Sequence, residues 1–205
     1  MKTTCAGIIL SGGRNTRMGG INKAFLRLCG RYYLDWIIDT LSGTCSELLL
    51  VTREPVLYRD WDLEIVQDIF QFRSPLTGLH AGLVNMQADY AFCTSCDTPL
   101  LESEIVQVLI DEIEFEYDVI VPASGTYYQP LCAIYSKRCI PFIEEQLSFG
   151  NLKADHLYKK IKLKEIPYER FEAIDPDLNS FFNVNTPEDI HSADRLLKQK
   201  KQRIF

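Results

Sequence analysis

The segment at residues 8–23 constrains the fold of this chain more than any other, because an apolar strand runs there directly into a glycine-rich, basic loop. Ile8, Ile9 and Leu10 are followed by Ser-Gly-Gly-Arg-Asn-Thr-Arg-Met-Gly-Gly-Ile-Asn-Lys at residues 11–23. Paired glycines allow a sharp turn and a close approach of the backbone to a ligand. Loop amides and nearby Arg and Lys side chains form a receptor for a polyanion, so this segment predicts a site for a nucleoside triphosphate.

Two better-known glycine loops do not match the spacing. A Walker loop has Ser or Thr directly after its Lys, whereas Lys23 is followed by Ala24. A dinucleotide-binding fingerprint reads Gly-x-Gly-x-x-Gly, and no window of the segment supplies it. The predicted triphosphate site therefore requires another type of loop.

Composition favours one globular domain in the cytoplasm. A chain of 205 residues buries a large core without disulfides, and neither a membrane-spanning run nor a secretory signal is expected from its sequence. The formal charge of −6 disfavours a nucleic-acid-binding surface. The seven cysteines have no regular spacing, which predicts reduced thiols. Cys93 and Cys96 lie in an extended apolar run and are expected to be buried structural thiols rather than a zinc or redox pair.

Strand and helix patterns alternate along the chain. Apolar residues recur at helical spacing within residues 32–41, and residues 47–52 and 89–94 are continuous apolar strands, typical of a sheet covered on both faces. Further strands are predicted at residues 63–66, 118–122, 128–135, 162–166 and 181–185, and further helices at residues 76–87, 102–112, 136–147, 153–160 and from 187 onward. This order predicts an α/β fold with a mostly parallel sheet and helices on both faces.

Candidate binding residues gather at one edge of this sheet. Ligands of parallel sheets bind beyond the carboxyl ends of the strands. The loop at residues 11–23, Asp68 and Asp97 follow three predicted strands, and Thr52 ends a fourth. Pro99 stops the strand before it, which leaves the Asp97 carboxylate at this edge. A triphosphate needs Mg²⁺ held by one or two carboxylates, so Asp97 is the predicted metal ligand, with helix capping as the alternative.

Four separated segments carry recognisable motifs. They read Leu-Ser-Gly-Gly at residues 10–13 with Arg-Met-Gly and Asn-Lys after it, Ser-Pro-Leu-Thr-Gly at 74–78, Cys-Asp-Thr-Pro at 96–99 and Asn-Val-Asn-Thr-Pro-Glu at 183–188. Together they resemble the nucleotidyltransferase family that includes the molybdenum cofactor guanylyltransferases, whose first motif usually reads Leu-Ala-Gly-Gly, Arg-Met-Gly and Asp-Lys. This chain departs from it at Ser11, where the family has Ala, and at Asn22, where it has Asp.

The resemblance implies a fold and a reaction. The fold is a Rossmann-like sheet of the nucleotide-diphospho-sugar transferase, or GT-A-like, type, in a single nucleotidyltransferase domain over residues 1–205. Residues 1–100 are expected mainly to bind the nucleotide and residues 101–205 mainly the acceptor. The implied reaction transfers GMP from GTP to the terminal phosphate of molybdopterin, with or without bound molybdenum, and releases pyrophosphate. It also implies exchange of the cofactor with other molybdenum cofactor biosynthesis or acceptor proteins, and no nucleic-acid or membrane partner.

The resemblance also implies roles for individual residues. Arg17, Lys23 and Asp97 are expected to be catalytic. Mg²⁺ is expected on Asp97 and Asn185, with Asn183 as another candidate ligand and helix capping as another role for Asn185. The implied GTP contacts are Leu10, Ser11, Gly12, Gly13, Lys23, Thr52, Asp68, Gly78 and Asp97.

Two rival functions fit the same motifs. One is a nucleotidyltransferase of the same fold that uses CTP or a sugar phosphate. Asp68 argues for GTP, because a carboxylate accepts hydrogen bonds from both the ring N–H and the amine of guanine. The other is a non-catalytic nucleotide sensor or partner-binding module, which the missing negative charge at Asn22 favours. Turnover with each of the four nucleotides distinguishes these functions.

Overall fold

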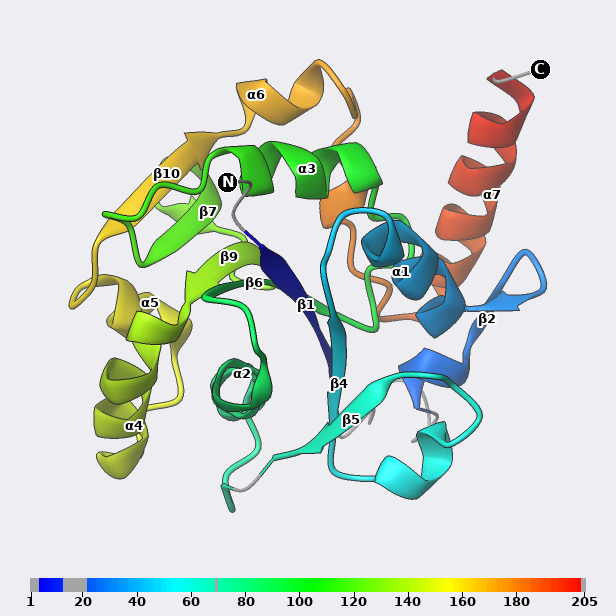
Figure 1. The fold of residues 1–205 in the computed structure, drawn as a ribbon. Helices are drawn as coiled ribbons and strands as arrows, with labels where there is room; N and C mark the ends of the chain where they lie inside the picture. Colours follow the sequence, from blue (N-terminus) through cyan, green and yellow to red (C-terminus); the bar gives the residue numbers. More distant parts are fainter. Residues whose placement is uncertain (1–3, 13–21, 69, 204–205) are drawn as a thin grey trace.

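A single mixed sheet forms the centre of the molecule. The computed structural model describes residues 4–12, 22–68 and 70–203. Its strands are β1 (Cys5–Ser11), β4 (Leu48–Thr52), β5 (Glu64–Gln67), β6 (Tyr90–Ser95), β7 (Val119–Ser124), β8 (Tyr127–Tyr128), β9 (Cys132–Ser136) and β10 (Leu163–Pro167). In this part of the chain they form an eight-stranded sheet in the order β10-β7-β9-β6-β1-β4-β5, with β8 paired to β7 (Figure 1). Pairs that involve β8 or β9 are antiparallel and the other pairs are parallel, which confirms the predicted mostly parallel sheet.

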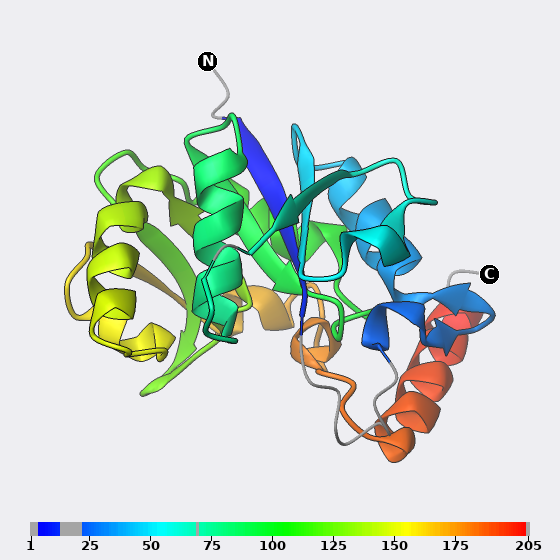
Figure 2. The same cartoon turned by 90° about the horizontal axis from the view of Figure 1, so that it is seen from below.

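Helices cover both faces of this sheet. One face carries α2 (Pro75–Asn85), α4 (Ile140–Ser148) and α5 (Ala154–Tyr158), and the other carries α1 (Tyr33–Ser42), α3 (Ser103–Asp111) and α6 (Glu169–Glu172) (Figure 1). The last helix, α7 (Pro187–Arg203), packs beside the small hairpin of β2 (Arg27–Leu28) and β3 (Arg31–Tyr32), as Figure 2 shows from below. Short 3-10 turns are η2 (Lys23–Phe25), η3 (Pro55–Tyr58), η4 (Lys137–Cys139) and η5 (Asn179–Phe181). None of the helices in the described ranges combines the length and the apolar character needed to cross a bilayer.

The apolar core consists of two layers, one on each face of the sheet. Along β1, Ile8 and Leu10 pack into the layer beneath α2, while Cys5 and Ile9 pack into the layer beneath α1 and α3. Because successive side chains of a strand point to opposite faces, both layers require apolar residues, which explains the unbroken apolar sequence of β1. Helix α2 approaches β1 closely at Gly82, where a Cβ would lie 2.6 Å from Ile8 Cδ1.

One predicted strand is wrong. Residues 181–185 do not join the sheet; they leave η5 as irregular chain, and the backbone N–H of Val184 donates to the Asp97 carbonyl at 2.8 Å. The aromatic residue Phe181 is instead buried against Tyr168 and Phe171, so its burial needs no strand pairing. The predicted strand at residues 128–135 is also divided into β8 and β9, and the predicted helix at 136–147 starts with the 3-10 turn η4 before α4 begins.

The hairpin of β2 and β3 is not predicted by the sequence patterns above. Its turn places Cys29 at φ 49° and Gly30 at φ 84°, so both central residues have a left-handed backbone. Such turns usually contain Asn or Asp before Gly, because a cysteine rarely adopts this conformation. The Cys29 backbone N–H donates to the Asp194 carboxylate on α7 at 3.0 Å, a long-range contact that stabilises the unusual turn.

Candidate active site

The carboxyl ends of four parallel strands meet at one edge of the sheet. Strand register places Ser11 beside Thr52, Thr52 beside Gln67, and Leu10 beside Ser95. A cavity of about 230 Å³ opens at this edge. Eight of the residues predicted to bind GTP line the described part of it, namely Leu10, Ser11, Gly12, Lys23, Thr52, Asp68, Gly78 and Asp97. Gly13 and Arg17, also predicted for this site, lie outside the described residues.

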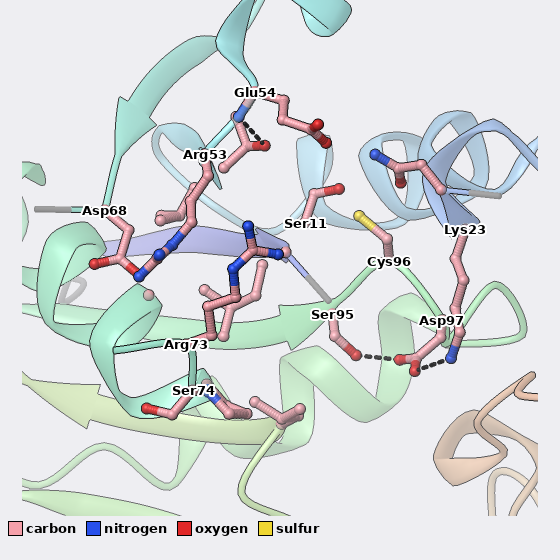
Figure 3. A pocket seen from close by; sticks show the side chains of 18 residues that line it. Ser11, Lys23, Arg53, Glu54, Asp68, Arg73, Ser74, Ser95, Cys96 and Asp97 are labelled. Atoms are coloured by element: carbon pink, nitrogen blue, oxygen red, sulfur yellow. Dashed lines mark hydrogen bonds and ion pairs between the residues drawn. The ribbon is translucent and has the colours of Figure 1, made fainter. Parts of the chain in front are cut away.

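Lys23 joins three distant segments at one side of the cavity. Its Nζ donates to Asp97 Oδ2 at 2.9 Å and to Asn185 Oδ1 at 2.5 Å. The Lys23 and Asp97 side chains are 14% and 21% exposed, so the pair is shielded from water but reachable by a ligand. The Ser95 hydroxyl donates to the other oxygen of Asp97, as Figure 3 shows. The predicted meeting of the loop lysine with the strand-end carboxylate is therefore present.

The start of α7 positions Asn185. The Asp189 carboxylate accepts from the backbone N–H groups of Asn185 at 2.9 Å and Thr186 at 2.8 Å, and the Thr186 hydroxyl accepts from the Asp189 N–H at 3.2 Å. This reciprocal cap, with Pro187 as the first helical residue, confirms the helix start predicted from the sequence. The bond from the Asn185 N–H contributes most to lowering the pKa of Asp189. Asn183 is exposed and does not contact Lys23 among the described hydrogen bonds.

Asp68 organises the opposite side of the cavity. Its carboxylate accepts from Thr77 Oγ1 at 2.7 Å, from the Phe70 N–H at 2.9 Å and from Arg53 Nη2 at 3.1 Å. Arg53 also donates to the Phe70 carbonyl at 2.6 Å and to the Phe72 carbonyl. These donors hold the chain between β5 and α2 in place. Three donors thus occupy the Asp68 carboxylate, and a hydrogen bond from guanine to Asp68 stays a prediction.

Gly78 and Ser74 shape the wall formed by the start of α2. The Ser74 hydroxyl accepts from the Thr77 N–H at 3.3 Å and caps the helix. A Cβ at Gly78 would lie 3.1 Å from Leu10 Cδ2, so a side chain there would press on the cavity floor. The absence of a side chain at Gly78 therefore keeps the space above Leu10 open.

Arg73 is a cavity residue that the sequence motifs do not identify. It comes immediately before Ser74, is exposed, and extends into the cavity in Figure 3. Within the described part of the chain its guanidinium has no hydrogen-bond or ion-pair partner, whereas Lys23 and Arg53 are both paired with carboxylates. A basic residue directly before a helix start at the ligand-binding edge of the sheet is the signal that could have identified it.

The cysteines near the site are free, buried thiols. All seven cysteines are free, and Cys93 and Cys96 are buried in opposite core layers, which confirms their predicted burial in the core. Burial raises the pKa of Cys96, which lines the cavity, to about 12. In the described residues no group of three or more His, Cys, Asp or Glu side chains is arranged to hold a metal ion.

Alkylating reagents should therefore not modify the Cys96 thiol in the folded protein. A thiol whose pKa is raised stays protonated, and thus unreactive, until the pH approaches that raised value. We expect iodoacetamide at about pH 8 to leave Cys96 unlabelled in the folded protein, as measured by peptide mass spectrometry. The same treatment in urea should label it, and rapid labelling without urea would contradict the buried position of this thiol.

Known proteins are similar to this chain over most of its length. A family model described as the MobA-like NTP transferase domain matches residues 7–162. A protein of Desulfosudis oleivorans named molybdenum cofactor guanylyltransferase is 41% identical over 192 residues, covering 94% of this chain and 95% of that protein. One of the same name from Aliivibrio fischeri is 29% identical over 191 residues, covering 93% and 95%.

Solved structures share the fold. Molybdopterin-guanine dinucleotide biosynthesis protein A from Archaeoglobus fulgidus superposes with a TM-score of 0.84 at 24% identity, covering 95% of this chain and 99% of that one. A 2-C-methyl-D-erythritol 4-phosphate cytidylyltransferase from Thermus thermophilus gives 0.70 at 14% identity, covering 96% and 100%. Fold and site together place the chain in the class of nucleotidyltransferases. The chain belongs to the MobA-like NTP transferase family.

Proposed function

We propose that this protein transfers GMP from GTP to the terminal phosphate of molybdopterin, forming the guanine dinucleotide of the cofactor and pyrophosphate. The observation that carries the proposal is the Lys23–Asp97 pair at 2.9 Å, on a cavity at the carboxyl edge of the sheet. Relatives named molybdenum cofactor guanylyltransferase support it, because their similarity extends over nearly the whole of both chains.

The proposed chemistry requires few groups from the protein. An oxygen of the acceptor phosphate attacks the α-phosphorus of GTP, a new P–O bond forms, and the bond to the leaving pyrophosphate breaks. Lys23 neutralises the negative charge that grows on the phosphate oxygens, which is the main form of catalysis available in phosphoryl and nucleotidyl transfer. A phosphate monoester is largely dianionic near neutral pH, so no general base is needed. Consistently, no histidine lines the described part of the cavity.

The residues around Lys23 fit a metal ion of the kind expected for this family. Two oxygens, one from the Asp97 carboxylate and one from the Asn185 amide, already converge on a cation, the Lys23 ammonium. Mg²⁺ prefers oxygen ligands and completes its shell with phosphate oxygens and water, so two protein ligands suffice. We infer that Asp97 and Asn185 would hold Mg²⁺. Bound there, it would withdraw negative charge from the nucleotide phosphates.

The two halves of the chain contribute differently to the cavity. Among the described residues every cavity-lining residue except Leu131 precedes position 100. This supports nucleotide binding mainly by residues 1–100, and leaves residues 101–205 to provide most of the acceptor site. Leu131 lies at the junction of two cavities, because it also lines a second, apolar cavity with Pro130 and Tyr135.

A nucleotide panel tests the proposed activity. The protein is incubated with molybdopterin, Mg²⁺ and one of GTP, CTP, ATP or UTP, and pyrophosphate release is measured. GTP should give the highest kcat/KM and a pterin dinucleotide as product. Preference for CTP or UTP would overturn the guanylyl assignment, and nucleotide binding without turnover would favour a sensor.

Arg73 should contribute to GTP binding rather than to the chemical step. Its guanidinium has no partner among the described residues and is available to an anionic or carbonyl group of the nucleotide; such charge-assisted bonds are strong. We expect Arg73→Gln to raise the KM for GTP about tenfold with little change in kcat. Initial rates over a range of GTP concentrations measure this effect. Arg170→Gln, which removes an exposed arginine of α6 that is paired with Glu112, is the matched control and should leave the KM unchanged.

A further inference from the structure

Tyr58 lies behind the cavity wall and is hydrogen-bonded to residues that line it, Ser11 and Asn22 among them. It is the last residue of η3 and is fully buried, and it is not itself among the described lining residues. Its hydroxyl is hydrogen-bonded to Ser11 Oγ at the end of β1 and accepts from Asn22 Nδ2 at 2.7 Å. These two partners are the positions where the chain departs from the first of the family's motifs, and they are connected through this one hydroxyl.

Asn22 connects Tyr58 to the turn that carries Lys23. Its Oδ1 accepts from the Ala24 N–H at 3.1 Å and caps η2, the turn whose first residue is Lys23. The other end of the same turn also contacts Tyr58, because the Phe25 and Tyr58 rings lie 5.2 Å apart. Tyr58 therefore holds the turn at both ends, by its hydroxyl at Asn22 and by its ring at Phe25.

We propose that Tyr58 is a positioning residue that fixes Lys23 opposite Asp97. It does so through its hydrogen bonds with Ser11 and Asn22. An Asn amide donates to the tyrosine oxygen, so the tyrosine hydroxyl remains free to donate to Ser11. An Asp at position 22 could only accept, which would require Tyr58 to donate to it and Ser11 to donate to Tyr58. The serine at position 11 permits either arrangement, whereas an alanine would permit neither bond to β1.

The hydroxyl keeps its proton over the working pH range. Burial raises the pKa of Tyr58, although its hydrogen bonds with Ser11, Asn22 and Thr52 lower it in part. The raised value means that the neutral phenol, which donates one bond and accepts others, is the form present at neutral pH. The Ser11–Tyr58–Asn22 connection is therefore expected to persist wherever the enzyme is active.

The inference rests on the proposed function for its kinetic test. We expect Tyr58→Phe to lower kcat for GMP transfer about tenfold, as one lost hydrogen bond predicts, with no comparable change in the Lys23→Ala background. This non-additivity is the mark of a residue that acts through Lys23. Equal losses in both backgrounds, or no loss in the wild-type background, would overturn the proposal. Tyr33→Phe is the matched control, because Tyr33 is also fully buried and its hydroxyl has no partner among the described residues.

A second pair of variants tests the proposal independently of the stability of Tyr58→Phe. Asn22→Ala removes the cap and the bond to Tyr58, whereas Asn22→Asp retains an acceptor for both the Ala24 N–H and the Tyr58 hydroxyl. We expect Asn22→Asp to recover most of the kcat lost in Asn22→Ala, and equal losses in the two variants would overturn the proposal.

A binding measurement separates this inference from the proposed function. If the wild-type protein shows no transfer, the proposed function is wrong, and calorimetry of GTP binding then decides the role of Tyr58. Tyr58→Phe should weaken GTP binding in the wild-type background and leave it unchanged in Lys23→Ala. Unchanged affinity in both backgrounds would contradict the positioning role.

Discussion

Replacing Lys23 with alanine is expected to lower kcat for GMP transfer by roughly 10²–10³-fold, the usual cost of removing one group that stabilises transition-state charge. Lys23 is the cation held at 2.9 Å from Asp97 and 2.5 Å from Asn185, so its removal takes away a positive charge that would stabilise the growing phosphate charge. The measurement is the initial rate of pyrophosphate release at saturating GTP and molybdopterin. The free energy of unfolding should change little, because Asp97 keeps its hydrogen bond from the Ser95 hydroxyl.

Two controls define this result. Lys23→Arg keeps the charge but not the compact ammonium, so it should recover only part of the lost rate. Lys160→Ala removes a lysine from an exposed pair with Glu145 on α4 and should leave kcat within about twofold of the wild-type value. A wild-type rate in Lys23→Ala would show that the lysine takes no part in catalysis.

Replacing Asp97 with asparagine should have an effect of similar or greater size, about 10³-fold in kcat, together with a loss of apparent metal affinity. The amide retains the shape and the hydrogen-bonding partner Ser95 but carries no negative charge, which hard cations require of their ligands. The measurement is the rate of transfer as a function of Mg²⁺ concentration. The variant should need much more Mg²⁺ to reach its own, lower maximum.

Asp39 provides the matched carboxylate control for this variant. It is 60% exposed and paired with Arg31 on the surface, so Asp39→Asn should leave both kcat and the Mg²⁺ dependence unchanged. If Asp97→Asn retained the wild-type Mg²⁺ dependence, the metal would have to bind elsewhere. If it retained the wild-type kcat as well, Asp97 would be no more than a structural partner of Lys23.

The approach of Lys23 to Asp97 was predictable because it follows from topology. Both residues come after strands that run in the same direction, and neighbouring parallel strands end at the same edge of a sheet. A sequence separation of 74 residues therefore becomes a contact of 2.9 Å. The same reasoning predicted that Thr52 and Asp68 would line the cavity, since Thr52 ends one strand of that sheet and Asp68 follows another.

Asn185 reaches the site by a route that strand patterns do not predict. The segment before it was expected to be a strand, but it crosses the end of β6 as irregular chain, held by one backbone bond from Val184 to Asp97. The apolar and aromatic residues there face two different cores rather than two faces of a sheet, so their alternation imitates a strand. Only the motif resemblance indicated that this asparagine belongs to the site.

Arg73 and Tyr58 show which features of the site the sequence did not reveal. Arg73 precedes a capped helix start, and its direction depends on how Asp68 and Arg53 fold the preceding loop. Tyr58 is hydrogen-bonded to Ser11 and Asn22, which come 47 and 36 positions earlier in the chain, so no local pattern indicates these partners. Such contacts are set by tertiary packing of short 3-10 turns and loops, where side-chain periodicity carries little information.

The fate of the α-phosphorus of GTP shows whether the protein transfers a guanylyl group. GTP radiolabelled at that position is incubated with the protein, Mg²⁺ and molybdopterin, and the pterin product is isolated. Guanylyl transfer predicts that the label and the guanine both appear on the pterin, while GTP labelled at the γ-phosphorus yields only labelled pyrophosphate. Label from the γ-position on the pterin, or no label from the α-position, would contradict the assignment.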